Sequence, residues 1–417
     1  MIIVDLHIHS RFSRACSPEL NLPNIAEWCG IKGINLVATG DFTHPAWFEE
    51  IKDNLIEEGN GLLHLKNGNS EIKFILGTEV SCIYSQGGKT RRVHLCLFFP
   101  NLADVEKFNN TLTDRGCNIH SDGRPILGLS SIEVLKIMKS INERSVMIPA
   151  HAWTPWFAVF GSKSGFDSLE ECFGDLSSEI FAIETGLSSD PAMNWMLSAL
   201  DKVTLVSSSD AHSLPNLGRE ANVFNLDIAK ASYDDLFLAI KNKDPKIFLN
   251  TVEFYPEEGM YHFDGHRDCD VCFAPADTKK NKNICPKCKK PVVVGVLNRV
   301  EVLADRAEGF VPSNSIPFVS LVGLDKIICE ALGIKSRSSN KVQKKYNELI
   351  KKGDNEFNIL LNLSYPELAK ITLPEIVEGI RRVREKKLSI SPGFDGQYGK
   401  VTIFSSEERK VFQEKLF

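Results

Sequence analysis

Short hydrophobic, β-branched runs recur through the first half of the chain, and they predict strands buried on both faces. The runs cover residues 2–6, 34–39, 73–78, 92–99, 145–150, 180–185 and 203–208. Helical patterns lie between several of them. Residues 130–141 open with a serine cap and place apolar side chains on one face, and residues 190–200 begin with an aspartate and a proline. Strands that alternate with helices indicate a parallel sheet or barrel.

Each of these predicted strands carries chemically active side chains at or near its carboxyl end. In chain order they are His7 and His9, Asp41, Glu79, His94, His151, Glu184, and Asp210 with His212. In barrels of alternating strands and helices the active site is built at that face. Imidazole suits zinc, manganese or iron, and a carboxylate can bridge two ions. The sequence therefore predicts one site that holds several metal ions.

Four of the eleven cysteines are clustered as two Cys-X2-Cys pairs, Cys269 with Cys272 and Cys285 with Cys288. This spacing predicts a zinc ribbon in which four thiolates hold one structural zinc ion. A disulfide framework is the alternative, and it does not suit a cytosolic chain. The lysines around the pairs, including Lys287 and Lys289, suit contact with DNA phosphates or form a solvated basic surface.

The C-terminal part of the chain is basic and mainly helical. Residues 335–417 hold 17 basic and 11 acidic residues, a net charge of +6, whereas the rest of the chain carries −11. Helices are predicted at residues 324–332, 340–352 and 373–387, and the last contains Arg381, Arg382 and Arg384. This asymmetry favours a polyanionic partner held by the tail, although a solvated helical surface has the same composition. The glycines of residues 391–404 indicate an anion-binding loop or a plain β-turn.

Composition places the chain among ordinary globular proteins, with 417 residues, 43% hydrophobic and 25% charged. No apolar run approaches the roughly 20 residues that span a bilayer. The N-terminal segment lacks the basic region and cleavage site of a signal peptide. We expect a cytoplasmic protein without a membrane partner.

The motifs DLHIHS, GTE, PAH and SSSDAH resemble those of the PHP family, the polymerase and histidinol phosphatases. The resemblance implies a distorted seven-stranded (β/α) barrel and two or three divalent ions, Zn, Mn or Mg, that hydrolyse phosphate esters. The ligands it implies are His7, His9, Glu79, His94, His151, Asp210 and His212. The second motif departs from the family, because Thr39-Gly40-Asp41 stands where many members have Thr-Asp-His. Asp41 is the candidate ligand there, with His44 as the substitute. Asp5 and Glu184 are expected to orient ligands, and Glu184 is also a possible ligand.

A barrel of this type followed by a four-cysteine ribbon and a basic helical tail resembles the endonuclease Q family, and the likeness covers essentially the whole chain. It implies three domains: a metallophosphoesterase barrel (1–258), a zinc-binding domain (259–298) and a helical DNA-contacting domain (299–417). It also implies a DNA repair endonuclease that nicks 5′ to uracil, hypoxanthine, xanthine and abasic sites. Asp210, Glu79 and His151 are the catalytic candidates, and which of them is the general base stays open. Arg381, Arg382, Arg384, Lys287 and Lys289 are the candidates for DNA backbone contact.

The loop at residues 151–175 follows a ligand strand, so it is expected to receive a damaged base that has been flipped out of the duplex. Its candidate pocket residues are Trp153, Trp156, Phe160, Ser162, Ser164 and Phe166. Most of these aromatic residues could equally belong to the core. Three other functions stay open: a small-molecule phosphatase, a nucleic-acid-binding protein with an inactive site, and a proofreading nuclease module.

Overall fold

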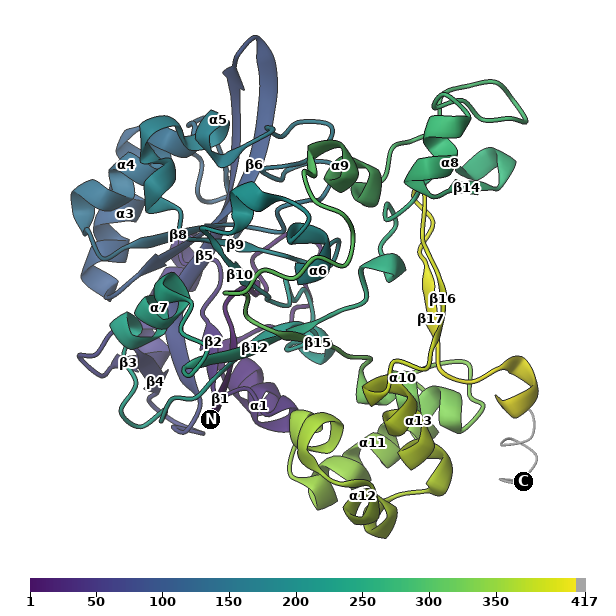
Figure 1. The fold of residues 1–417 in the computed structure, drawn as a ribbon. Helices are drawn as coiled ribbons and strands as arrows, with labels where there is room; N and C mark the ends of the chain where they lie inside the picture. The colour runs from purple at the N-terminus through teal and green to yellow at the C-terminus, as the bar shows by residue number, and fades with distance from the viewer. Residues whose placement is uncertain (410–417) are drawn as a thin grey trace.

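A computed structural model describes residues 1–409 as a large α/β body, a small module and a helical domain (Figure 1). The large sheet of the body contains β1 (Ile2–Asp5), β2 (Leu36–Ala38), β3 (Leu55–Glu57), β4 (Leu63–Leu65), β5 (Lys73–Gln86), β6 (Lys89–Phe99), β7 (Ile126–Leu127), β8 (Val146–Pro149), β11 (Ala221–Phe224), β12 (Phe248–Glu253) and β15 (Phe318–Ser320). Its main path runs β15-β12-β11-β1-β2-β5-β4-β3, and β6, β7 and β8 attach through β5 and β6. The fold is therefore a mixed α/β structure with one large sheet.

All seven hydrophobic runs contain a strand, but their pairing differs from the prediction. The β1–β2 and β2–β5 pairs are parallel, as expected. β5 and β6 are antiparallel, because the left-handed glycines Gly87 and Gly88 join them in a tight hairpin. β9 (Ala182–Glu184) and β10 (Thr204–Val206) pair in parallel with each other, outside the large sheet. The strands are thus only partly parallel, and the β5–β6 hairpin projects from the body (Figure 1).

The helices of the body follow the predicted caps. They are α1 (Leu22–Lys32), α2 (Pro45–Asn54), α3 (Leu102–Asp114), α4 (Ser131–Ile141), α5 (Leu169–Phe173), α6 (Pro191–Asn194), α7 (Tyr233–Asn242) and α9 (Val296–Leu303), with short helices η1 (Gly174–Glu179), η2 (Ser198–Leu200), η3 (Leu214–Asn216) and η4 (Pro256–Glu258). α4 begins with a capping box between Ser130 and Glu133 and buries one apolar face. The helix predicted at 190–200 is shorter than expected: Asp190 caps α6, and η2 covers the rest.

The helical domain contains α10 (Leu324–Ala331), α11 (Asn340–Gly353), a π-turn η6 (Asn358–Asn362), α12 (Tyr365–Ile371) and α13 (Pro374–Arg384). The helices predicted at 324–332, 340–352 and 373–387 are present as α10, α11 and α13. Two parts of the segment 299–322, which the predicted boundary at 298 assigns to this domain, contact the body. β15 extends the large sheet beside β12, and Arg299 of α9 donates to the carbonyls of Phe160 and Phe166.

The small module lies beside the body, at the tip of a ribbon that rises from the helical domain (Figure 1). It comprises β13 (Asp264–His266), η5 (Arg267–Cys269), β14 (Val271–Phe273) and α8 (Pro275–Lys280). The ribbon comprises β16 (Ser389–Ser391) and β17 (Lys400–Thr402), which are antiparallel. The turn between them bonds to the chain entering the module: the Gly393 amide donates to Glu257 O, and the Gly396 amide donates to Met260 O. The glycine-rich segment is therefore a turn that packs on the module.

A buried ion pair joins the body to the helical domain. Lys32, the last residue of α1, donates to Glu356 at 2.6 Å, and their side chains are 11% and 7% exposed. Glu356 also accepts from the Tyr346 hydroxyl at 2.6 Å and from the Leu324 amide at 2.9 Å. Three hydrogen bonds thus compensate the carboxylate for its loss of water.

Across the residues that the structure describes, no helix is both long enough and apolar enough to cross a membrane.

Candidate metal centre and surrounding surface

The polar residues that end the strands of the body converge on one site. His7 and His9 follow β1, His94 lies in β6, and His151 follows β8. Glu79 lies in the middle of β5, because that strand continues into the hairpin beyond the predicted end at residue 78. Its carboxylate oxygens nevertheless contact imidazoles from three other segments, so it occupies the centre of the site.

Two groups of ligand atoms share Glu79. In the first group, His9 Nε2 lies 3.2 Å from Glu79 Oε2 and 3.1 Å from Asp210 Oδ1, and His7 Nε2 lies 3.4 Å from Glu79 Oε2. In the second group, Glu79 Oε1 lies 2.6 Å from His94 Nδ1 and 3.1 Å from His151 Nε2. Both groups are compact enough to hold a metal ion. A carboxylate between two sets of imidazoles is the arrangement expected of a bridging ligand.

His7 provides a further sign of a missing partner, since its Nε2 is buried without a hydrogen bond. Its other ring nitrogen, Nδ1, lies 3.0 Å from Glu184, which also accepts from the His151 amide at 2.8 Å. Glu184 thus contacts two histidines of the cluster, a position that suits an orienting residue. Cys96 lies next to His7 and Glu184 and forms a third compact group with them, which sequence patterns did not indicate.

Asp41 supports His9 from behind. Its Oδ1 lies 2.9 Å from His9 Nδ1, and its Oδ2 accepts from the amide and hydroxyl of Ser10 at 2.6 and 2.7 Å. Both oxygens are thereby used away from the metal-facing Nε2 of His9, and Asp41 joins no ligand group of the described residues. The geometry gives Asp41 an orienting position in place of the predicted ligand position. His44 lies apart from the cluster, with Nε2 3.2 Å from His120 O.

The segment after β10 is held in an unusual backbone conformation. Asp210 has a left-handed φ of +46°, a conformation that costs a residue with a Cβ about 1–3 kcal/mol. Arg219 donates to the carbonyls of Ser209 and Asp210, and Asp5 accepts from the Ser209 and Gly218 amides. These contacts hold Asp210 against His9. His212 Nδ1 donates to Asp210 O at 2.9 Å, and the ring lies at the rim with 30% of its side chain exposed.

The acidic groups of the cluster create an electrostatic environment that favours the binding of positive charge. Burial lowers the pKa of His7 and His9, but the surrounding acidic groups outweigh burial and hold both values well above the usual range. Burial raises the pKa of Glu79 and Asp210, yet the imidazoles around them lower both values below the usual range. Burial dominates at His94 and lowers its pKa to about 4, so its ring is neutral and can serve as a ligand.

Arg124 is a functional candidate that sequence reasoning missed. Its Nη1 lies 3.0 Å from Glu79 Oε2, and the side chain keeps 24% exposure. It sits on a loop that approaches the site closely: a side chain at Gly123 would begin 2.4 Å from Asp41 Oδ2. No motif surrounds Arg124, so only the fold reveals that its charge faces the cluster.

The predicted base-pocket residues separate into buried and exposed groups. Trp153, Phe160 and Phe166 are at most 1% exposed, and Ser164 is also buried. Trp153 donates to Asn194 Oδ1 at 2.7 Å, and Arg91 stacks over Phe166 at 4.0 Å. These aromatics are core residues, which is the alternative that the sequence left open. Trp156 and Ser162 are the exposed members.

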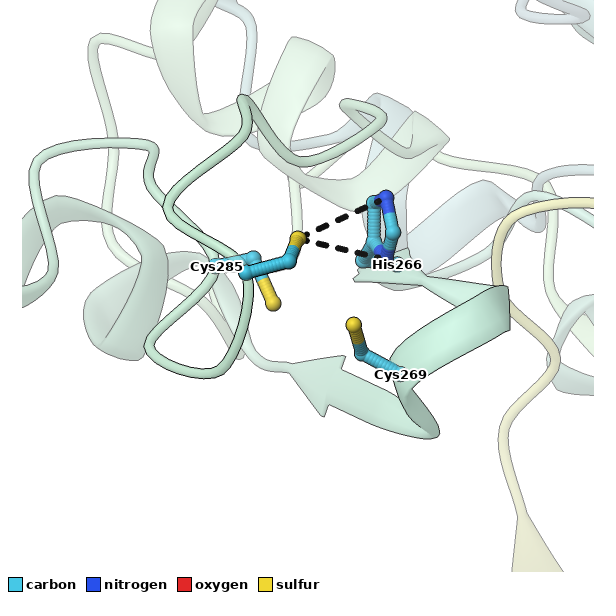
Figure 2. A group of neighbouring side chains, drawn as sticks. His266, Cys269 and Cys285 are labelled. Atoms are coloured by element: carbon cyan, nitrogen blue, oxygen red, sulfur yellow. Dashed lines mark hydrogen bonds between the residues drawn. The ribbon is translucent and has the colours of Figure 1, made fainter.

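The zinc-ribbon prediction changes in one ligand. The compact group in the module is His266, Cys269, Cys285 and Cys288, with His266 in place of Cys272 (Figure 2). Both ring nitrogens of His266 lie 3.9 Å from Cys288 Sγ. The β13–β14 pairing explains the difference. Val271 stands opposite His266, and Cys272 stands opposite Gly265. Because successive side chains of a strand point to opposite faces, Cys272 and His266 face opposite sides of this pair of strands. Cys272 itself is exposed.

The predicted DNA-contacting arginines of α13 are engaged within the helical domain. Arg381 pairs with Glu378 and Glu385, and Arg382 pairs with Glu378 and Glu408. Arg384 donates to Leu360 O and Ile359 O. The guanidinium groups therefore stabilise the domain, and they are poor candidates for phosphate contact. Lys287 and Lys289 donate to Cys269 O and Pro286 O but remain exposed on the module.

Comparisons with known proteins agree with this architecture. Residues 323–387 match the family model of the MJ0043 C-terminal domain. The uncharacterized protein YqxK of Bacillus subtilis is 28% identical over 96% of this chain and 99% of its own length. The uncharacterized protein MJ0043 of Methanocaldococcus jannaschii is 34% identical over 64% of this chain, which spans only 33% of that relative.

Two solved structures extend the likeness to the whole fold. The lesion-specific endonuclease PfuEndoQ of Pyrococcus furiosus superposes with a TM-score of 0.85 and 32% identity, over 98% of this chain and 96% of that one. Endonuclease Q in complex with a 27-mer duplex bearing an abasic lesion superposes with a TM-score of 0.84 and 32% identity, over 100% of both chains. With this identity over nearly the full length of both chains, the protein belongs to the endonuclease Q family.

Proposed function

We propose that this protein is a DNA repair endonuclease that hydrolyses the phosphodiester bond 5′ to deaminated bases and abasic sites. The observation that carries the proposal is the pair of ligand groups joined by Glu79, within a fold shared with a lesion-specific endonuclease. Support for a DNA substrate comes from the relative that is bound to a duplex with an abasic lesion. Uracil, hypoxanthine and xanthine are the deaminated bases we propose.

The residues of the cluster suit two divalent ions, Zn, Mn or Mg. His7, His9, Glu79 and Asp210 would hold one ion, and Glu79, His94 and His151 would hold the other. Such ions supply Lewis-acid activation of water and neutralise phosphate charge. His212, at the rim beside Asp210, is the remaining candidate ligand and would serve a third ion.

The open side of the cluster has its own roles. The side chains of Asp210 and Arg124 are 22% and 24% exposed, whereas those of Glu79 and His9 are fully buried. Arg124 would bind a non-bridging oxygen of the scissile phosphate, since a guanidinium matches phosphate geometry. The Asp210 carboxylate reaches this side, and it is our candidate to accept a proton from the attacking water. Arg219 would keep Asp210 in place.

The module would bind one structural zinc ion through His266, Cys269, Cys285 and Cys288. Its exposed lysines, Lys287 and Lys289 among them, are our candidates for contact with DNA phosphates. These contacts would be independent of the metal chemistry, because they lie on a separate part of the chain.

A single nicking assay tests the proposal. The protein with Mn²⁺ is incubated with duplexes that carry uracil, hypoxanthine, xanthine, an abasic site or no lesion, and with a chromogenic phosphomonoester. We expect nicks 5′ to the lesions and little hydrolysis of the monoester. Efficient monoester hydrolysis with intact lesion duplexes would overturn the proposal in favour of a small-molecule phosphatase.

A further inference from the structure

An exposed aromatic pair lies beside the metal centre. Trp156, on the loop after His151, is 37% exposed and packs edge-to-face against Tyr261, with ring centroids 5.5 Å apart. Tyr261 belongs to the segment that leads into the module. The two rings therefore come from different parts of the protein and leave aromatic surface open to solvent.

Short contacts connect this pair to the ligand groups. The Thr154 hydroxyl lies 3.1 Å from His151 Nδ1 and donates to Trp156 O at 2.9 Å. The next residue, Phe157, accepts from the His94 amide at 3.0 Å, and its ring centroid lies 4.7 Å from that of His94. Phe157 adopts a left-handed φ of +61°, so the loop is held in one strained shape against two ligands. Trp156 is thus fixed at the edge of the site.

The turn of the β16–β17 ribbon adds a third segment. A side chain at Gly396 would begin 3.7 Å from the Tyr261 hydroxyl and 3.4 Å from Arg267 Nη1. Two residues further on, Tyr398 is 75% exposed, the most exposed of the large hydrophobic residues that the structure describes. The ribbon turn therefore approaches Tyr261 at Gly396 and carries an exposed aromatic residue two positions further on.

Exposed cations on the same three segments indicate the kind of partner. Lys163 and Lys400 are exposed on the loop and the ribbon, and the Arg267 side chain is 56% exposed. Cations beside exposed aromatic faces are the composition that binds single-stranded nucleic acid, because bases stack on the rings and phosphates contact the charges. Paired bases inside a duplex have their faces covered by their neighbours, so such a surface selects nucleotides without a partner.

We propose that Trp156, Tyr261 and Tyr398 form a surface that binds an unpaired nucleotide of the substrate by stacking. This inference rests on the proposed function, because the nucleotide that would stack on the surface belongs to the lesion-bearing duplex whose phosphodiester bond lies at the metal centre. Such a surface would let the protein prefer damaged over undamaged DNA, and it requires no base pocket among the buried aromatic residues of the loop. Trp153, Phe160 and Phe166 would then keep the loop in shape.

Binding is measured in Ca²⁺, without cleavage, on two duplexes that differ only in one unpaired 2-aminopurine nucleotide. We expect Trp156→Ala and Tyr261→Ala to weaken binding of the unpaired duplex by about 10- to 100-fold, the usual effect of losing one stacked base. Binding of the fully paired duplex should change by less than about twofold. Trp156→Phe should restore most of the preference and of the 2-aminopurine quenching.

The controls separate stacking from misfolding. Leu238→Ala changes a residue of α7 that is 53% exposed, and α7 lies away from the module (Figure 1), so the ratio of affinities should equal that of the natural protein. Zinc content and melting temperature report the folding of each variant. Tyr398→Ala, at the most exposed position, provides a second test if Trp156→Ala fails to fold.

The nicking assay on the natural protein separates failure of the stacking surface from failure of the proposed function. If the natural protein nicks lesion duplexes but all three alanine variants keep the affinity ratio within about twofold, the stacking surface is wrong and the proposed function stands. If the natural protein nicks no lesion duplex but Trp156→Ala loses the preference for the unpaired nucleotide, the surface stands and the proposed function fails.

Discussion

The buried pair between Lys32 and Glu356 makes a strong prediction about stability. We consider Glu356→Gln, which keeps the shape of the side chain and removes its charge. Lys32 would then lie at 11% exposure with an amide where a carboxylate had been 2.6 Å away, and the Tyr346 hydroxyl would lose a charged acceptor. Removal of one partner from a buried ion pair costs about 3–5 kcal/mol, because the other charge is left without compensation.

The structure favours the lower end of this range. A cavity of about 170 Å³ lies between the body and the helical domain and is lined by both Lys32 and Glu356. This volume admits several water molecules, which would partly solvate the free ammonium group. We therefore expect a loss of about 3 kcal/mol.

Urea unfolding of both proteins, followed by tryptophan fluorescence, measures the loss, and hydrogen exchange of residues 346–362 shows whether the junction opens first. Glu170→Gln is the control, since its partner Lys202 is 60% exposed and such surface pairs contribute about 0–1 kcal/mol. If Glu356→Gln costs no more than Glu170→Gln, the pair does not hold the two domains together.

The pair between Lys32 and Glu356 should also make the stability of the protein depend on pH in the acid range. Burial raises the pKa of Glu356, but Lys32, Tyr346 and the Leu324 amide outweigh it and hold the value below the ordinary 4.5. A lowered folded pKa contributes stability above the unfolded pKa, and this stability is lost as the pH falls through the folded value. The natural protein should therefore lose junction stability below about pH 4.5, whereas Glu356→Gln should show a flatter profile over the same range. Equal pH profiles would contradict this assignment.

Three further changes test the metal centre, the module and the helical domain. Asp210→Asn should lower nicking by more than about 100-fold, because loss of a ligand exceeds the 10- to 100-fold effect of losing a supporting group, while duplex affinity in Ca²⁺ stays within a few fold; unaltered nicking would exclude Asp210 from the site. His266→Ala should remove about one zinc ion per chain, and Cys272→Ser should leave the zinc content unchanged, as measured by metal analysis; the opposite result would restore the four-cysteine site. Arg384→Ala should destabilise the helical domain by about 1–3 kcal/mol through the unpaired carbonyls of Leu360 and Ile359, with the salt dependence of DNA binding unchanged; a flatter salt dependence without loss of stability would make Arg384 a DNA contact.

The cluster was predictable because strand ends position side chains in a way that sequence periodicity reveals. His7, Glu79, His94 and His151 each lie on or directly after a hydrophobic run, so the fold brings them together once the strands form. Asp41 could not be assigned in the same way. A carboxylate that contacts His9 Nδ1 and one that binds the metal differ only in side-chain orientation, and the periodicity of the sequence carries no information about that orientation.

Charge patterns failed where partners were close in sequence. The net positive charge of the tail drew attention to Arg381 and Arg382, but Glu378 on the same helix and Glu385 at its C-terminal cap stand three or four residues away and neutralise them. In the module, the two Cys-X2-Cys pairs concealed a His-X2-Cys pair, His266 and Cys269, with the same spacing. Register in the β13–β14 pair decides which residue faces the other cysteines, and that register depends on tertiary packing.

The return of the β16–β17 ribbon to the module has a mechanical consequence. A module joined to its neighbour only by its own chain ends can swing about that attachment. Here the ribbon turn provides a second anchor through the amides of Gly393 and Gly396, and Lys326 of α10 bonds Glu258 at the same junction. The polypeptide thus forms a closed linkage of body, module and helical domain, and rotation of the module about its chain ends would have to break these hydrogen bonds.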